Sequence, residues 1–304
     1  MLGEVCYWIF NMSISASLMG LIVLLIRKLQ FIPHRISVIL WIVPFFRMCI
    51  PLGLNSPYSL MTLITRLTAK TITVYQPADD ISLSASNFIM AADSYFPITY
   101  KHYALEGVFA VAGLVWLIGT LAIIIALIIV YAATKREIRD AELLKDNVFI
   151  SEKVDGPAVY GIIRPRIILP PSYTERGLKY VLQHERTHIR RGDNLWRLLG
   201  FLAAEIHWFN PLCWLFLKEF LSDLELACDE KAVSGYNVEE RKEYAKTLLD
   251  HAQSKSVFAS AFGGSKVRTR IENVLSYKQM TVLSATGFTI LLIAIIFTLI
   301  TNAG

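Results

Sequence analysis

Four stretches of the chain are long, apolar and almost free of charged residues. They cover residues 7–26, 37–54, 107–133 and 281–300. Each approaches or exceeds the roughly 20 residues that an α-helix needs to cross the hydrocarbon core of a bilayer. The pattern predicts an α-helical membrane protein with about four transmembrane helices.

The composition leads to the same conclusion. Hydrophobic residues make up 54% of the 304 residues and charged residues 18%, whereas soluble domains contain roughly 45–50% apolar and about 25% charged residues. An ordinary soluble domain is therefore excluded. Basic Arg27 and Lys28 follow the first apolar stretch rather than precede it, which favours a retained membrane anchor over a cleaved signal peptide.

The basic residues that flank the apolar stretches predict the topology. They follow the first and third stretches and precede the fourth: Arg27, Lys28, His34, Arg35, Lys135, Arg136, Arg139, Lys266, Arg268, Arg270 and Lys278. Because basic residues concentrate on the cytoplasmic side, both chain termini are expected outside. Residues 1–133 then form a membrane region with three helices and an external loop at about 55–106. Residues 134–280 form a cytoplasmic domain, and residues 281–304 form the fourth helix and a short external tail. The net charge of +5 needs no nucleic-acid partner.

The expected cytoplasmic domain begins with strands and continues with helices. Short β-branched runs at 147–151, 158–162 and 166–169 are separated by glycines and prolines, which predicts a small sheet. A helix should open near Ser172 with a capping box and end before Gly192. The predicted domain is therefore α+β.

The apolar stretch at 195–220 is interpreted as a helix pair rather than a further crossing. It carries charged residues and is interrupted at Pro211, and proline breaks helices because it lacks a backbone N–H. A crossing would also place Glu225 on the opposite side of the membrane from His184. The pair should pack against the membrane or dip into it. Two further helices are expected, over residues 223–232 and from an Asn237 cap.

The run His184-Glu185-Arg186-Thr187-His188 matches the H-E-x-x-H pattern and lies in the first predicted helix of this domain. Histidines at i and i+4 share one helix face, so both imidazoles can bind one zinc ion while Glu185 lies beside an open coordination position. The plainer alternative is a pair of surface or core histidines. Glu185 between them favours a catalytic metal site.

A catalytic zinc ion needs a third protein ligand, and Glu225 is the best candidate. Asp229 lies one turn later on the same face and should orient a ligand imidazole by accepting a hydrogen bond from it. Asp193 is another candidate for this orienting role, or an ordinary turn residue. Glu225 and Asp229 could also be simple solvated charges of an acidic helix. No histidine follows His188 at the metzincin spacing, which excludes that class.

Such a site predicts peptide hydrolysis without a covalent intermediate. A bound zinc ion activates water and polarises the scissile carbonyl, so Glu185 would accept a proton from the water and pass it to the leaving amine. No serine or cysteine has to be a nucleophile. The four cysteines have no metal-site or disulfide spacing and are expected to be buried, unreactive thiols: Cys6, Cys49, Cys213 and Cys228.

Two rival functions stay open. One is a membrane zinc protease for housekeeping or prenylated-protein processing, which would need an enclosed chamber and more spans. The other is a non-catalytic membrane signalling subunit with a structural metal, in which Glu185 would have no use.

The motifs together resemble the integral-membrane metallopeptidases of the BlaR/MecR type, peptidase family M56. The matching stretches are 156–161, 165–170, 184–193, 207–211, 225–230, 262–264 and 270–273. The resemblance implies a multi-pass protein of a bacterial cell membrane with a gluzincin-like zinc metallopeptidase domain. On an external signal, this domain would cleave itself and cause loss of a cytoplasmic winged-helix repressor of the BlaI/MecI type, as in antibiotic responses. Members that sense β-lactams continue into an external penicillin-binding domain, whereas this sequence stops at Gly304, so a separate sensor protein could supply the signal.

Two segments are candidates for contact with a protein or peptide substrate. The region 256–265 resembles in position the self-cleavage region of the family, with Ser260, Ala261 and Phe262 at its centre, but an ordinary loop fits equally well. The run 158–162 is expected to be an edge strand that pairs with an extended peptide. The scissile bond, the external ligand and homo-oligomer formation stay open.

Overall fold

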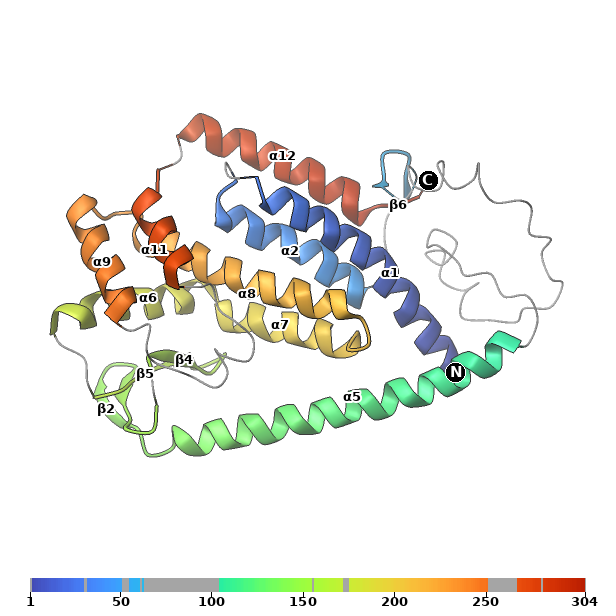
Figure 1. Ribbon diagram of the computed structural model, residues 1–304, viewed down its shortest axis with the longest axis horizontal. Helices are drawn as coiled ribbons and strands as arrows, with labels where there is room; N and C mark the ends of the chain where they lie inside the picture. The colour runs from blue at the N-terminus through green and yellow to red at the C-terminus, as the bar shows by residue number, and fades with distance from the viewer. Residues whose placement is uncertain are drawn as a thin grey trace.

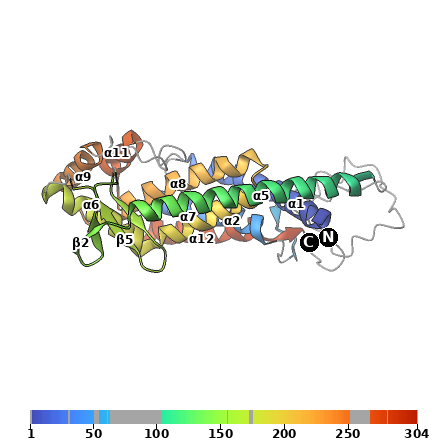
Figure 2. The same ribbon diagram turned by 90° about the horizontal axis from the view of Figure 1, so that it is seen from below.

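The structure is a computed structural model, mainly helical and elongated, in which both chain ends lie at the same end of the molecule (Figures 1 and 2). It describes residues 2–29, 32–50, 55–60, 62, 104–154, 156–171, 175–250, 267–279 and 281–303. A four-stranded sheet and several shorter helices gather at the opposite end. This end contains the candidate metal-binding residues.

Three helices are long and apolar enough to cross a membrane: α1 (Leu2–Arg27), α5 (Ala104–Glu137) and α12 (Val282–Ile300). They coincide with the first, third and fourth predicted spans. Only 6% of the apolar window of α5 and of α12 is buried, against 50% for α1. Large exposed apolar surfaces of this kind mark contact with a membrane or a partner.

The second predicted span forms α2 (His34–Cys49), which is not one of these three helices. Its 16 residues extend about 24 Å at ~1.5 Å per residue, which is less than the roughly 30 Å of a hydrocarbon core. The helix packs against α1 and α12. A membrane crossing by α2 therefore stays a prediction.

The stretch at 195–220 lies in a pair of helices, α7 (Asp193–Ile206) and α8 (Pro211–Ala232), as expected. Asn210 caps α8, because its side-chain oxygen accepts a hydrogen bond from the Leu212 N–H at 2.9 Å. The prediction of a separate helix at 223–232 is wrong. No glycine or proline interrupts α8 after Pro211, so one helix runs to Ala232.

The main hydrophobic core forms where α8 packs against α1 and α2. Trp41 of α2 and Phe216 of α8 are both fully buried, with ring centroids 5.6 Å apart. On α1, Gly20 lies so close to Phe216 that an added Cβ would overlap its ring. Helix α8 is thereby fixed against the two N-terminal helices.

The sheet consists of β2 (Glu142–Lys145), β3 (Val148–Ile150), β4 (Ala158–Tyr160) and β5 (Arg166–Leu169), in the order β2-β3-β5-β4. Strands β3 and β5 are parallel, whereas β2 and β4 pair antiparallel with their neighbours. The three predicted strands are confirmed. Strand β2 was not predicted, because its residues are all exposed and show no apolar alternation.

Helix α6 (Glu175–Arg191) carries the H-E-x-x-H run and packs on this sheet. Its Val181 joins Ile167 and Leu169 of β5 in one buried cluster. The helix ends before Gly192, as predicted, and Gly192 adopts a left-handed conformation with φ of 67° that glycine tolerates well. The expected start at Ser172 lies outside the described residues.

Two further helices, α9 (Val238–Asp250) and α11 (Val267–Ser276), pack against each other beside α6 and α8. The predicted Asn237 cap is confirmed: Asn237 Oδ1 accepts from the Glu240 N–H at 2.9 Å, and Glu240 Oε2 accepts from the Asn237 N–H at 3.0 Å. Buried Tyr244 and Val274 share the core between α9 and α11.

A short parallel pair joins β1 (Asn55–Ser56) to β6 (Asn302–Ala303). It places the start of the predicted external loop beside the last residues of the chain. Most of the 55–106 loop lies outside the described residues. The side of the membrane on which these two segments lie stays a prediction.

Candidate metal centre

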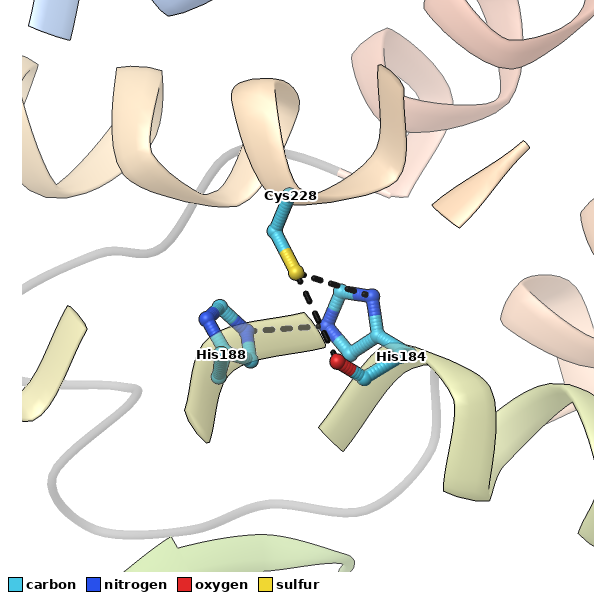
Figure 3. Close-up of side chains that lie close together, drawn as sticks. All are labelled: His184, His188 and Cys228. Atoms are coloured by element: carbon cyan, nitrogen blue, oxygen red, sulfur yellow. Dashed lines mark hydrogen bonds between the residues drawn. The ribbon is translucent and has the colours of Figure 1, made fainter. Parts of the chain in front are cut away.

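His184 and His188 lie one turn apart on α6 and point toward α8 (Figure 3). Both side chains belong to buried residues, 8% and 4% exposed. Their Nε2 atoms are 3.0 Å apart. The i, i+4 spacing thus brings two imidazole nitrogens to one point.

The opposite ring nitrogens each have a partner. His188 Nδ1 lies 2.6 Å from Asp193 Oδ2, and His184 Nδ1 lies 2.8 Å from the Tyr244 hydroxyl. The Tyr244 hydroxyl donates its proton to Asp229 Oδ1 at 2.7 Å, because a carboxylate can only accept, so His184 Nδ1 donates to Tyr244. With a metal bound, both rings would keep the proton on Nδ1 and offer the Nε2 lone pair at the shared point, the arrangement of metal-ligating histidines.

Glu225 on α8 faces both Nε2 atoms. Its Oε2 lies 3.6 Å from His184 Nε2, and its Oε1 lies 3.6 Å from His188 Nε2. Two ligand atoms that bind a tetrahedral zinc ion at roughly 2.0–2.1 Å are about 3.3 Å apart. The Nε2–Nε2 separation of 3.0 Å fits a common metal ion, and the two 3.6 Å contacts, which run to different oxygens, place the Glu225 carboxylate within reach of it.

The prediction that all four cysteines are buried is wrong for Cys49, which is exposed. Cys228, predicted only as a buried thiol, lies beside the two histidines (Figure 3). Its Sγ is 3.7 Å from His184 Nδ1, and ligand atoms of Cys228, His184 and His188 lie within 4.8 Å of one another. A His-His-Cys set is thus a second way to hold a metal. Glu225 is the other candidate, because its two oxygens each face one Nε2 atom, while each also contacts an arginine.

Two arginines hold the acidic residues of the site. Arg197 Nη2 lies 2.5 Å from Glu225 Oε1. Arg270 donates to both oxygens of Asp229, at 2.7 and 2.8 Å, and its Nη1 lies 3.5 Å from Glu225 Oε2. Burial raises the pKa of the Asp229 carboxyl, but the Arg270 guanidinium outweighs burial and holds this pKa well below its usual range. Burial likewise opposes ionisation of Glu225, and His188, with its neighbours, lowers the pKa of Glu225.

The neighbours of His184 and His188 favour a positive charge on both rings. Burial alone would lower the pKa values of His184 and His188, but Cys228 and other acidic neighbours raise both well above the ordinary value. Burial and the Asp229 charge raise the pKa of Tyr244, which keeps its hydroxyl protonated. Surroundings that favour a positive imidazole also favour a bound metal cation.

The remaining predicted site residues have these positions. Glu185, the predicted base, directly follows His184 on α6 and is buried, 7% exposed. Asp229 and Asp193, predicted to orient ligands, lie beside the two histidines. The predicted self-cleavage residues lie outside the described residues: Ser260, Ala261 and Phe262.

Strand β4 lies at an edge of the sheet, as expected for the run 158–162. Its outer side is partly occupied, because Asn194 Nδ2 donates to the carbonyl oxygens of Val159 and Gly161 at 3.0 and 2.9 Å. Asn194 lies in the first turn of α7, close to the end of α6. One amide thus fixes the edge strand beside the metal centre.

Several proteins resemble this chain. Residues 7–275 match the family described as BlaR1 peptidase M56. The chain is 28% identical over 186 residues to "Regulatory protein BlaR1" of Bacillus licheniformis, which covers 56% of this chain and 30% of that protein. It is 26% identical over 145 residues to "Methicillin resistance mecR1 protein" of Staphylococcus aureus, which covers 44% of this chain and 25% of that protein. The chain therefore spans less than a third of the length of these curated relatives.

Proposed function

Because the chain belongs to peptidase family M56, we propose that it is a membrane-embedded zinc endopeptidase of a signalling pathway. Its apolar helices and its relatives are those of a bacterial membrane protein. The relatives are named as a regulatory protein and a methicillin-resistance protein, which supports a role in signal transduction.

One observation carries the proposal: the Nε2 atoms of His184 and His188 and the carboxylate of Glu225 surround one point at distances that fit a metal ion. We assign these residues as the zinc ligands. Asp193 and Asp229 orient the two imidazoles, directly or through Tyr244. Three protein ligands leave one coordination position open, which is the pattern of catalytic rather than structural zinc sites.

When bound, the zinc ion supplies Lewis-acid activation of water and of the scissile carbonyl. Glu185 is the base that accepts the proton of the attacking water and then gives it to the leaving amine. Its burial and its position directly after His184 on α6 support this assignment. Burial of the site excludes bulk solvent and strengthens the charge interactions there.

The proposed substrates are the protein itself and a cytoplasmic regulatory partner. Self-cleavage would fall near Ser260, Ala261 and Phe262. A winged-helix repressor of the BlaI/MecI type is the proposed partner whose loss is the output, and a separate sensor protein is a proposed source of the input. A substrate strand would pair with the β4 edge.

The proposed topology has α2 as a fourth span and both chain termini outside, with the peptidase domain in the cytoplasm. The separation of elements in Figure 1 supports it, because both chain ends lie at one end of the molecule and α6, α9, α11 and the sheet at the other. The gluzincin assignment rests on a glutamate, rather than a third histidine, as the third ligand.

The two rival functions predict other outcomes. A structural metal site would retain signalling when Glu185 is replaced, because such a site needs no base. A housekeeping protease would cleave unrelated membrane proteins and would not affect a repressor. Co-expression of wild type or Glu185→Gln with a BlaI-type repressor and an unrelated membrane protein, followed by immunoblotting, separates these cases.

The proposal is tested by incubating the purified protein in lipid nanodiscs with casein and with a peptide of residues 251–266. We expect zinc-dependent cleavage that 1,10-phenanthroline stops and added zinc restores, with fragments identified by mass spectrometry. Equal cleavage in the presence of the chelator would contradict a zinc peptidase.

A further inference from the structure

We propose that Arg270 is a positioning residue of the metal site, which holds Asp229 and Glu225 in place for metal binding. This inference rests on the proposed function, because it concerns the same zinc ligands. Arg270 lies on α11, 86 residues after His184. Neither the H-E-x-x-H run nor the acidic pair on α8 requires an arginine. Only the fold shows that Arg270 contacts the metal site.

The contact between Arg270 and Asp229 is a two-point contact. Nε donates to Asp229 Oδ2 at 2.7 Å, and Nη2 donates to Oδ1 at 2.8 Å. The Asp229 side chain is fully buried, and that of Arg270 is 17% exposed. A planar guanidinium matches a carboxylate in this way, whereas the ammonium group of lysine makes a single-point contact. The contact therefore fixes the rotation of the Asp229 carboxylate.

The orientation of Asp229 in turn determines the hydrogen bonds around His184. Asp229 Oδ1 accepts from the Tyr244 hydroxyl at 2.7 Å and lies 3.2 Å from His184 Nδ1. If Asp229 lost its two-point contact with Arg270, its carboxylate would be free to rotate. Rotation would weaken the contacts that direct His184 Nε2 toward the metal.

Arg270 also reaches the third ligand. Its Nη1 lies 3.5 Å from Glu225 Oε2, on the side opposite to the Arg197 contact with Oε1. The two guanidinium groups therefore flank the Glu225 carboxylate. Arg270 thus contacts both Glu225, a proposed ligand, and Asp229, which orients His184.

One contact could act in the opposite direction. Arg270 Nη2 lies 3.2 Å from His184 Nε2, and a guanidinium nitrogen can only donate. It would use the same lone pair that a metal ion needs, so Arg270 could compete with the metal. The two roles predict opposite signs: loss of Arg270 weakens zinc binding if it positions the ligands and strengthens zinc binding if it competes.

The test is the zinc dissociation constant of the full-length protein in detergent at fixed pH, measured by competition with a chelator of known affinity. For Arg270→Gln we expect zinc binding to weaken about 10–100-fold, the usual effect of losing a residue that orients a ligand. The zinc affinity of Arg270→Lys should lie between those of wild type and Arg270→Gln, because lysine keeps the charge but makes only a single-point contact. The matched control is Arg268→Gln, on the same helix, whose side chain is 89% exposed and pairs with Glu272 instead.

A second readout is independent of activity. The visible absorption spectrum of the Co²⁺-substituted protein reports ligand geometry, and we expect it to change in Arg270→Gln and not in Arg268→Gln. If Arg270→Gln does not fold, as judged by size-exclusion chromatography, the Arg270→Lys result decides. Zinc affinity within about twofold of wild type, or tighter, in the folded variant would overturn the proposal.

The failure of this inference differs from failure of the proposed function. If wild type binds zinc and cleaves peptide while Arg270→Gln binds zinc equally well, only the role of Arg270 is refuted. If wild type binds no stoichiometric zinc, the proposed function is refuted, and the role of Arg270 with it.

Discussion

Replacing Asp223 with asparagine should destabilise the protein by about 2–3 kcal/mol, because it removes charged hydrogen bonds at a buried carboxylate, while Arg27 keeps Glu219 as a second partner. Asp223 lies on α8 and is fully buried. Its carboxylate accepts hydrogen bonds from Arg27 Nε at 3.0 Å, from Arg27 Nη2 at 2.8 Å and from Trp41 Nε1 at 2.8 Å. Arg27 ends α1 and Trp41 lies in α2, so one carboxylate ties α8 to both helices.

Glu219→Gln is the matched control. Glu219 contacts the same Arg27, at 2.5 Å, but its side chain is 25% exposed. An ion pair that water can reach contributes only about 0–1 kcal/mol, so this variant should be nearly neutral. The double change Arg27→Met with Asp223→Leu removes both charges and should recover only part of the lost stability, because the Trp41 indole N–H loses its acceptor.

The assay is denaturant titration of the protein in mild detergent, with tryptophan fluorescence as the measure of unfolding. The reasoning requires Asp223→Asn to lose several times more unfolding free energy than Glu219→Gln. A loss of about 1 kcal/mol or less for Asp223→Asn, the value typical of an exposed pair, would refute the view that this carboxylate holds the helices together.

Three further changes test other contacts. Gly20→Ala should destabilise the protein by about 1–3 kcal/mol, since the new Cβ overlaps the Phe216 ring. The control is Gly287→Ala, because a Cβ at Gly287 meets open space, and equal destabilisation by the two variants would contradict tight packing of α8 against α1. Tyr244→Phe should weaken zinc binding about tenfold, because it removes the hydroxyl that lies 2.8 Å from His184 Nδ1. Competition with a chelator measures the zinc affinity, and an unchanged affinity would rule out an orienting role of Tyr244. Asn194→Ala should raise KM for peptide cleavage more than it lowers kcat, because it removes the two hydrogen bonds that fix the position of β4. Steady-state kinetics measures both constants, and a change confined to kcat would argue against a role of β4 in substrate binding.

Much of the fold could be predicted from local sequence patterns. The uncharged apolar stretches correspond to α1, α5 and α12, and the break at Pro211 separates two helices. Gly192 ends α6, and Asn237 with Glu240 caps α9. These features depend on residues that are close in the sequence, where periodicity, capping and proline chemistry act directly.

The features that were missed depend on tertiary contacts. Tyr244 lies 60 residues from His184, and Arg270 lies 86 residues from it, so no spacing rule connects them. Cys228 shares α8 with Glu225, but whether it faces the histidines depends on how α8 packs against α6. Local patterns therefore predicted the histidine pair and the two aspartates beside it, but not the contacts of Tyr244, Cys228 and Arg270 with the site.

The most direct test of the central claim compares wild type with Glu185→Gln, with the zinc content of each quantified. Glutamine keeps the shape of glutamate but cannot accept the proton, and general acid–base catalysis contributes roughly 10²–10⁴-fold to a rate. We expect one zinc ion in both proteins and a loss of peptide cleavage of at least about 100-fold in Glu185→Gln only. Full cleavage by Glu185→Gln, or zinc in wild type without any cleavage of itself or added peptides, would contradict a zinc peptidase in which Glu185 is the catalytic base.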